Sequence, residues 1–291
     1  MNKSDKKMIL VDYKRGMDLS DVKAYGVVLN SYEYSLNPID SFNSDEILLL
    51  NKEIKERGFK TLLNIDQIIK EEELGGFIDY FNKMICEFDY ILFSDMCVLS
   101  LTNDYSKLIY YPKTLVSSIY EVNELKALGI EAIISNELSI EEIKEIDKEC
   151  SYSVEAFGFH QMFYSRRKLL SLYSDYAKLD LKVEDGSFFI KEEIRDDYYP
   201  IYEFSKGTLI YTDYCYYLLD ELKELENVNF IYLNGLFFDL GYYIKVVNIY
   251  NDLINNKDNL NKDELFKMNY KFSKGFLNKK SVLLKEGEDD A

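Results

Sequence analysis

Short apolar runs alternate with helical patterns along almost the whole of this 291-residue chain. Each run has the length of a buried strand, and the segments between the runs space their aliphatic residues three or four positions apart, as a helix does. Strand followed by helix, repeated, predicts a parallel sheet. We expect eight strands, at residues 8–11, 25–29, 60–64, 90–93, 107–111, 131–134, 153–157 and 229–233.

Eight such units in fewer than 300 residues favour an α/β fold of the TIM type, a (β/α)8-like barrel, over an open sheet. The first connection, residues 12–24, is short for a full helix. Asn43 or Ser44 opens one predicted helix that Gly58 ends, and Ser139 with Glu142 forms a capping box for another. Two more helices are expected from Val122, Leu125 and Leu128, and from Leu218, Leu219, Leu222 and Leu225.

The strand–helix rhythm breaks once, between residues 182 and 212, where the residues alternate as in antiparallel strands. Turn candidates lie at Glu184-Asp-Gly186 and Ser205-Lys-Gly207. We interpret this segment as a β-rich insertion before the last barrel strand. The chain is thus predicted to be a single barrel domain, residues 1–255, followed by a polar, partly ordered tail, residues 256–291.

The charge balance restricts the partners. The chain has 35 basic and 52 acidic side chains, a formal net charge of −17 and a pI near 4.6. Binding a nucleic-acid backbone requires clustered Lys and Arg, so this chain is not expected to bind one unaided. The first residues lack the apolar core of a signal peptide, and no apolar run approaches a membrane span. We expect a cytoplasmic protein without a membrane partner.

Four cysteines, Cys86, Cys97, Cys150 and Cys215, lie 11, 53 and 65 positions apart. This is not the spacing of a zinc or iron-sulfur site. Cys97 follows a predicted strand and Cys150 precedes one, so a strand of about 16 Å separates them in a parallel sheet. We expect four reduced structural thiols and no metal.

The stretch Glu155 to Leu170, EAFGFHQMFYSRRKLL, is the first candidate site. It contains the only histidine, His160, just beyond a predicted strand, and three consecutive cations. Ser165 is expected to cap a helix, which would place Arg166 and Arg167 in its first turn. Cations there oppose the helix dipole, so an anion should compensate them. The alternative is that the arginines pair with carboxylates of this chain while His160 fills a hydrogen-bonded niche.

Common catalytic motifs are absent: the sequence has no dinucleotide-binding glycine motif, phosphate loop, zinc-protease motif or nucleophile elbow. Ser165 and His160 are close in sequence, but no third group that would orient them is identifiable. Asp95 and Asn136 each follow a predicted strand and either face the same barrel mouth as His160 or are helix caps.

The 155–170 stretch resembles the characteristic motif of peptidase family U32, the collagenase-like peptidases. Three further segments agree in order, at residues 191–200 (KEEIRDDYYP), 207–211 (GTLIY) and 272–277 (FSKGFL). In the fuller family motif cysteines follow the histidine, and several members use such cysteines to bind an iron-sulfur cluster. Here Gln161 and Met162 follow His160, so the resemblance is to a short, cysteine-poor branch.

That branch implies oxygen-independent hydroxylation of wobble uridine in tRNA, as one half of a heteromer with a cysteine-bearing U32 paralogue. We expect no cofactor in this chain, an iron-sulfur cluster only in the partner, tRNA bound through the complex, and a small carboxylated metabolite as a candidate ligand. The alternatives are a U32-type peptidase and a non-catalytic scaffold. The expected catalytic residues are His160, Arg166 and Arg167, and the expected substrate-binding residues are Glu155, Tyr164, Ser165, Lys168 and Arg195.

Overall fold

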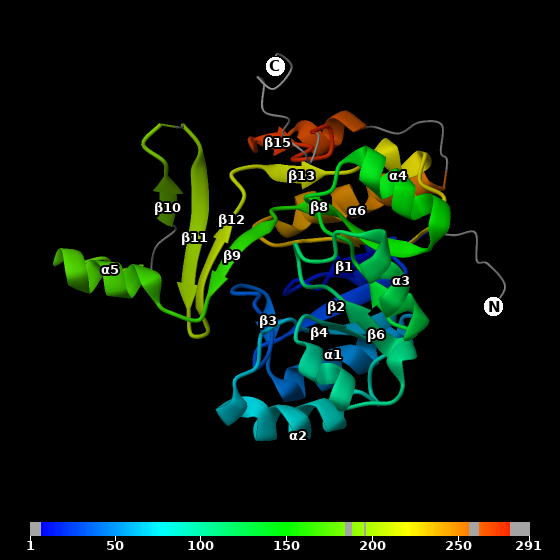
Figure 1. The fold of residues 1–291 in the computed structure, drawn as a ribbon, viewed down its shortest axis with the longest axis horizontal. Helices are drawn as coiled ribbons and strands as arrows, with labels where there is room; N and C mark the ends of the chain where they lie inside the picture. Colours follow the sequence, from blue (N-terminus) through cyan, green and yellow to red (C-terminus); the bar gives the residue numbers. More distant parts are fainter. Residues whose placement is uncertain (1–6, 184–187, 195, 256–261, 280–291) are drawn as a thin grey trace, which may run out of the picture.

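The computed structural model describes residues 7–183, 188–194, 196–255 and 262–279, and shows a mixed α/β fold built on one large curled sheet (Figure 1). Eight of its strands form one continuous run of parallel pairs and bridges, and all eight lie where the sequence predicts them. They are β1 (Met8–Asp12), β2 (Gly26–Ser31), β4 (Lys60–Ile65), β5 (Tyr90–Phe93), β6 (Leu108–Tyr110), β7 (Glu131–Ala132), β8 (Tyr152–Gly158) and β14 (Val228–Leu233).

The order along the sheet is β8-β14-β1-β2-β4-β5-β6-β7, so the last parallel strand pairs with the first. Between β7 and β8 the described residues form one parallel bridge, Ile133 with Ser153. Three short strands extend the sheet: β3 (Ser41–Phe42) beside β2, β13 (Cys215–Tyr217) antiparallel to β8, and β15 (Phe272–Ser273) beside β13. The curled α/β sheet is therefore observed, and full closure as a TIM-type barrel stays a prediction.

Two apolar layers explain why these runs form strands. The smaller cluster packs on the inside of the curl and takes Leu10, Val28, Leu62, Leu92 and Ile109 from five neighbouring strands. The larger cluster lies between the outer face of the sheet and the helices. Both faces of each strand are thus buried, which favours continuous apolar runs over strict alternation.

Helices alternate with the strands, namely α1 (Ser44–Glu56), α2 (Leu74–Met84), α3 (Ile119–Ala127), α4 (Ile140–Glu149), α5 (Leu169–Ala177) and α6 (Leu240–Ile254). Short 3-10 turns lie at η1 (Leu19–Asp21), η2 (Glu71–Glu73), η3 (Met96–Ser100), η4 (Tyr105–Lys107), η6 (Glu221–Lys223) and η7 (Lys262–Phe266). Asn43 caps α1, and the capping box of Ser139 and Glu142 begins α4, as predicted. The first connection contains only η1.

The helix predicted from the leucines at 218, 219, 222 and 225 is wrong. This segment follows β13, whose antiparallel pairing with β8 continues when the Leu218 N–H donates to the Ala156 carbonyl at 2.8 Å. The chain then forms only the single turn η6. All four leucines are buried, so the apolar spacing reports burial in an irregular segment rather than a helix.

Residues 161–212 form an arm that projects from the main sheet (Figure 1). It consists of α5 and an antiparallel sheet in the order β10 (Phe188–Lys191), β11 (Tyr198–Phe204), β12 (Gly207–Tyr211) and β9 (Gln161–Ser165). The turn predicted at residues 205–207 joins β11 to β12, whereas the one at 184–186 lies outside the described residues. The antiparallel structure is present, and β9 extends it earlier than residue 182.

The prediction that Ser165 caps a helix is wrong. Residues 161–165 pair with β12 instead, and α5 begins four positions later, after Lys168. The Ser165 hydroxyl accepts a hydrogen bond from the Arg167 N–H at 3.2 Å, within the turn that links strand and helix. Arg166 and Arg167 therefore precede the helix, and the argument from the helix dipole does not apply to them.

Part of the predicted tail is ordered against the main sheet. Leu265 and Leu277 are fully buried, and the Ile140 N–H at the start of α4 donates to the Leu277 carbonyl at 2.8 Å. Residues 256–261 and 280–291 lie outside the described residues. Within the described ranges, no helix is long and apolar enough to cross a membrane.

Candidate functional site

A row of buried polar side chains crosses the carboxyl ends of β1, β2 and β4. The Asn64 amide donates to Asn30 Oδ1 at 2.8 Å, and the Asn30 amide donates to Asp12 Oδ1 at 3.4 Å. Asp12 also accepts from the Tyr232 hydroxyl at 2.8 Å and the Gly235 N–H at 2.7 Å. Burial raises the pKa of Asp12 to about 6, although the hydrogen bonds from Gly235 and Tyr232 oppose the rise.

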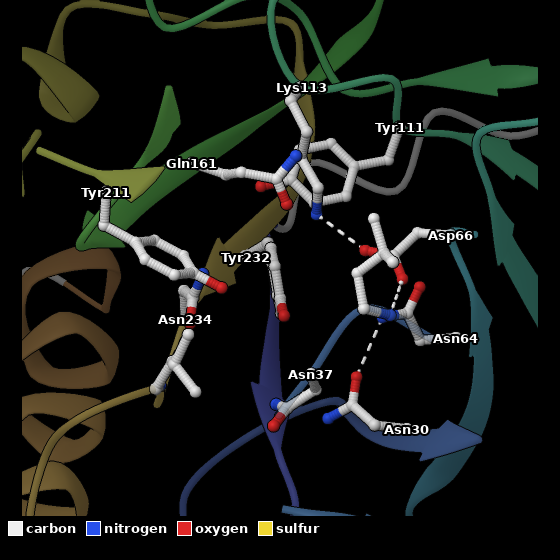
Figure 2. Close-up of a pocket in the computed structure, with 12 residues that line it drawn as sticks. Asn30, Asn37, Asn64, Asp66, Tyr111, Lys113, Gln161, Tyr211, Tyr232 and Asn234 are labelled. Atoms are coloured by element: carbon white, nitrogen blue, oxygen red, sulfur yellow. Dashed lines mark hydrogen bonds and ion pairs between the residues drawn. The ribbon is translucent and has the colours of Figure 1, made fainter. Parts of the chain in front are cut away.

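Asp66, just past β4, forms an ion pair with Lys113 (Figure 2). Lys113 Nζ lies 3.0 Å from Asp66 Oδ2 and 3.7 Å from the centroid of the Tyr111 ring. Burial alone would raise the pKa of Asp66, but Lys113 and the Leu36 N–H outweigh burial, and this pKa lies below its usual range. Lys113 has a positive φ of 71°, a conformation that non-glycine residues adopt at functional sites and tight turns.

Glu155, on β8, lies at the centre of a second buried group. Its carboxylate accepts hydrogen bonds from the Tyr111 hydroxyl and, at 2.9 Å, from the Asn234 amide. His160 Nε2 lies 3.7 Å from Glu155 Oε2, and this nitrogen has no hydrogen-bond partner within the described part of the chain. Burial lowers the pKa of His160, although the charge of Glu155 acts in the opposite direction. Burial therefore favours the neutral ring, which can accept a proton at Nε2.

Two cavities lie near Glu155. The smaller, about 30 Å³, is lined by the polar residues of Figure 2, including Tyr111 and Asn234. The larger, about 410 Å³, is lined by His160 together with residues of the arm and of the segment 271–279. Gln161 lines both cavities. Glu155 therefore contacts the walls of one cavity through two hydrogen bonds and lies beside the histidine that lines the other.

The family match now adds to this geometry. The sequence matches the model of peptidase family U32 over residues 23–282. The chain belongs to peptidase family U32. It is also 23% identical over 251 residues to tRNA hydroxylation protein P2 of Bacillus subtilis (strain 168), covering 82% of this chain and 81% of that protein. Among solved structures, the U32 peptidase Mk0906 is 16% identical, with a TM-score of 0.49, covering 80% of this chain and 95% of that chain.

The residues predicted from the U32 motif fall into two groups. Glu155 and His160 lie together between the cavities. Arg166 lies on the arm, where its guanidinium donates to both Glu73 carboxylate oxygens at 2.7 and 2.8 Å and to the Ile68 carbonyl at 2.5 Å. The anion beside Arg166 is thus a carboxylate of this U32 protein. For Arg167, no side-chain partner is found in the described ranges.

The remaining predicted residues belong to the base of the arm. Tyr164 donates its hydroxyl hydrogen to the Lys206 carbonyl at 3.1 Å, and Ser165 accepts from a backbone N–H. Lys168 directly precedes α5. None of these three lines either cavity. Arg195 lies outside the described residues.

Asp95 and Asn136 were each expected either to face the barrel mouth or to cap a helix, and the structure places them differently. Asp95 caps η3 and accepts from the Ile69 N–H at 2.8 Å, so it holds two loops together. Asn136 lines the larger cavity of the U32 protein.

Sequence reasoning missed most of the polar wall of the smaller cavity. The missed residues share one signal, a polar side chain at or just beyond the carboxyl end of an apolar strand. In a parallel sheet these ends meet at one edge, where ligands bind. The residues in the wall are Asn30, Asn64, Asp66, Lys113, Tyr232 and Asn234, and Asp12, which does not line the cavity, accepts a hydrogen bond from Tyr232.

The cysteines of this U32 protein do not form a shared site. Cys150 and Cys215 are buried, Cys97 is half-buried and Cys86 is exposed. Within the residues that the structure describes, no group of three or more His, Cys, Asp or Glu side chains is arranged to hold a metal ion. The described residues of this chain do not fit an iron-sulfur cluster.

Proposed function

We propose that this U32 protein is a subunit for the oxygen-independent hydroxylation of wobble uridine in tRNA. The observation that carries the proposal is the similarity to tRNA hydroxylation protein P2, which extends over 82% of the chain. The buried Glu155 and His160 lie within the matched family region, residues 23–282. A cysteine-bearing U32 paralogue is the proposed partner, and it would supply the iron-sulfur cluster and the RNA-binding surface that a chain of charge −17 lacks.

The larger cavity supports a binding role for this chain in the reaction. It has the size of a small-molecule site, and we assign to it the small carboxylated metabolite. Its wall offers the ammonium of Lys279 to a carboxylate. His160, which lines this cavity beside Glu155, would accept a proton from the bound metabolite at its Nε2 atom, because burial favours the neutral ring and this nitrogen has no hydrogen-bond partner in the described part of the chain.

A peptidase is the weaker alternative. The serine and histidine that are close in sequence have different surroundings, because His160 lines the larger cavity and Ser165 lies at the base of the arm. A serine peptidase needs the two within hydrogen-bond reach. The proposed role needs no nucleophile from this chain.

We also propose that the main sheet is a TIM-type barrel that the Ile133–Ser153 bridge closes, and that the protein works in the cytoplasm. The barrel, with the arm as its insertion, would form one domain together with the ordered residues 262–279 of the tail. Hydrogen exchange at the Ile134 N–H, which donates to the Ser153 carbonyl at 2.9 Å, tests the closure. Protection comparable to that of β4 is expected, and exchange as fast as in exposed loops would contradict it.

The functional test is analysis of tRNA nucleosides by mass spectrometry in strains with and without the gene. We expect the hydroxylated wobble uridine to disappear on deletion and to return with the wild-type gene. Glu155→Gln should not restore it, whereas the exposed control Glu71→Gln should. An unchanged nucleoside in the deletion strain would reject the function. Full restoration by Glu155→Gln would instead favour the non-catalytic scaffold.

A further inference from the structure

The arm exposes an unusual number of large apolar side chains. Ten of the twenty exposed large hydrophobic residues in the described part of the chain lie within residues 161–212, and Tyr176 and Ile194 are each 88% exposed. Exposed apolar groups that gather in one region mark interaction sites, whereas scattered ones do not. We call these ten the arm surface: Met162, Phe163, Leu172, Tyr173, Tyr176, Leu179, Phe189, Ile190, Ile194 and Tyr198.

On α5 the exposed apolar residues form a stripe. Leu172 and Tyr176 are four positions apart and share one face of α5, and Tyr173 lies beside them. Exposed Leu179 follows just after the helix, which Lys178 ends with a φ of 54°. The beginning of the helix is attached to the arm sheet, because the Leu169 N–H donates to the Thr208 hydroxyl at 2.9 Å. The stripe is therefore an apolar helix face without a partner in the described structure.

The strand register places further apolar residues on both faces of the arm sheet. Directly paired residues share a face, so Phe163 and Ile190 lie on the side of Thr208, to which α5 is attached. Phe189 and Tyr198 lie on the side of Tyr202 and Tyr211, whose rings contact Phe237 of the body. Phe163, Phe189, Ile190 and Tyr198 each keep at least about two fifths of their surface exposed in the described structure.

Charge identifies the occupant. Residues 161–212 contain eight basic and nine acidic side chains, so the arm carries a formal charge of −1 and the rest of the chain carries −16. Two copies joined through their arms would bring two strongly acidic bodies together. A basic partner would be attracted to the body while its apolar patch covers the arm.

We propose that the arm surface is the docking site for a partner protein of net positive charge. The proposal rests on the proposed function, which requires a second, RNA-binding subunit. A nucleic acid is the less suitable occupant because the arm has no excess of basic residues to contact a phosphate backbone. The partner's docking patch should be apolar, with Lys and Arg at the rim that faces the acidic body.

The test is the affinity between the full chain and the cysteine-bearing U32 paralogue of the same organism, measured by calorimetry at physiological salt. The arm variant is Leu172→Ser with Tyr176→Ser, and the control is Leu49→Ser with Tyr120→Ser, one exposed leucine and one exposed tyrosine on body helices. We expect the arm variant to weaken binding at least about tenfold, and the control to change it less than about twofold. The association rate should fall as salt rises.

Equal binding by the arm variant and wild type would overturn the proposal, as would no binding by wild type. Sedimentation of the isolated chain, alone and with tRNA, tests the other occupants. A dimer that is lost only in the arm variant would assign the arm surface to a second copy of this chain. Binding of tRNA that is lost only in the arm variant would assign the arm surface to RNA. The nucleoside assay separates this proposal from the proposed function. If binding depends on the arm but the nucleosides of the deletion strain are unchanged, the proposed function is rejected and the docking site is retained. If an arm variant that does not bind the partner fully complements the deletion, docking through the arm is not needed for the function.

Discussion

Replacing Asp12 by Asn should change how stability depends on pH. The pKa of Asp12 rises to about 6 in the folded state because burial disfavours the charge, against an ordinary value of 3.8 that the unfolded chain retains. Between these two values the folded state binds the extra proton. Stability is therefore lost as the pH rises through this window, and the loss is complete above about pH 6.

The size of the effect follows from the two pKa values. The penalty on the wild type is about 1 kcal/mol at pH 4.5 and about 3 kcal/mol at pH 8, so it grows by about 2 kcal/mol. The Asp12→Asn variant has no titratable group at this position and lacks this penalty. It also loses one acceptor for the Gly235 N–H or the Tyr232 hydroxyl, which costs about 1–3 kcal/mol at every pH. The informative quantity is thus the change of the wild-type–variant difference with pH, not its absolute value.

Urea unfolding followed by far-UV circular dichroism, at half-unit steps from pH 4.5 to 8, measures this difference. Asp66→Asn is the matched control, because the pKa of Asp66 lies below its ordinary value and the carboxylate stays ionised in both states throughout this range. The control difference should be flat. A flat difference for Asp12→Asn as well would refute the assignment of a buried, destabilising charge at the end of β1.

Three further predictions use the same material. The single histidine gives one imidazole titration by NMR, and burial should place the midpoint of His160 below 6.5; a midpoint at or above that value contradicts the buried position. Arg166→Met should cost about 1 kcal/mol of stability and Arg167→Met less than about 0.5, as measured by urea unfolding. Equal costs would argue against a stabilising ion pair between Arg166 and Glu73. Gly207→Ala should cost more than about 3 kcal/mol of stability, because the added Cβ would lie 2.0 Å from the Ser165 carbonyl oxygen. Gly58→Ala, with a positive φ but open space around it, should cost about 1 kcal/mol. Similar shifts in melting temperature for the two variants would show that the positive φ alone, and not the steric clash, determines the cost.

The strands were predictable because each is apolar on both faces. A run such as Val27-Val-Leu29 has no solvent-facing side and fits only a covered strand. The β9 strand was not predictable from local pattern, since its partner β12 lies more than forty positions further along and its exposed residues do not alternate clearly. Residues 161–165 form a strand because they pair with β12, and not because their own sequence favours a strand.

The candidate site was predictable in part for a related reason. His160 and Glu155 stood out because one is unique in the chain and both lie in a recognisable motif. Asn30 and Asn64 did not, because an asparagine after an apolar run is more often a cap or turn residue. Only the sheet order, which puts β2 beside β4, shows that their amides meet. Arg166 was noticed for its charge, but its partner Glu73 is more than ninety positions away.

The pairing of β1 with β14 has a consequence for synthesis on the ribosome. Met8 pairs with Phe230, so the first strand of the sheet receives one of its two neighbours only when nearly all of the chain has been made. At about 5–20 residues per second, the edge of β1 waits about 10–45 s without that partner. The waiting edge belongs to an apolar strand, and such edges aggregate when left unpaired. The nascent chain is therefore expected to depend on a chaperone during this interval, and its yield on slowly translated messages should fall when chaperones are depleted.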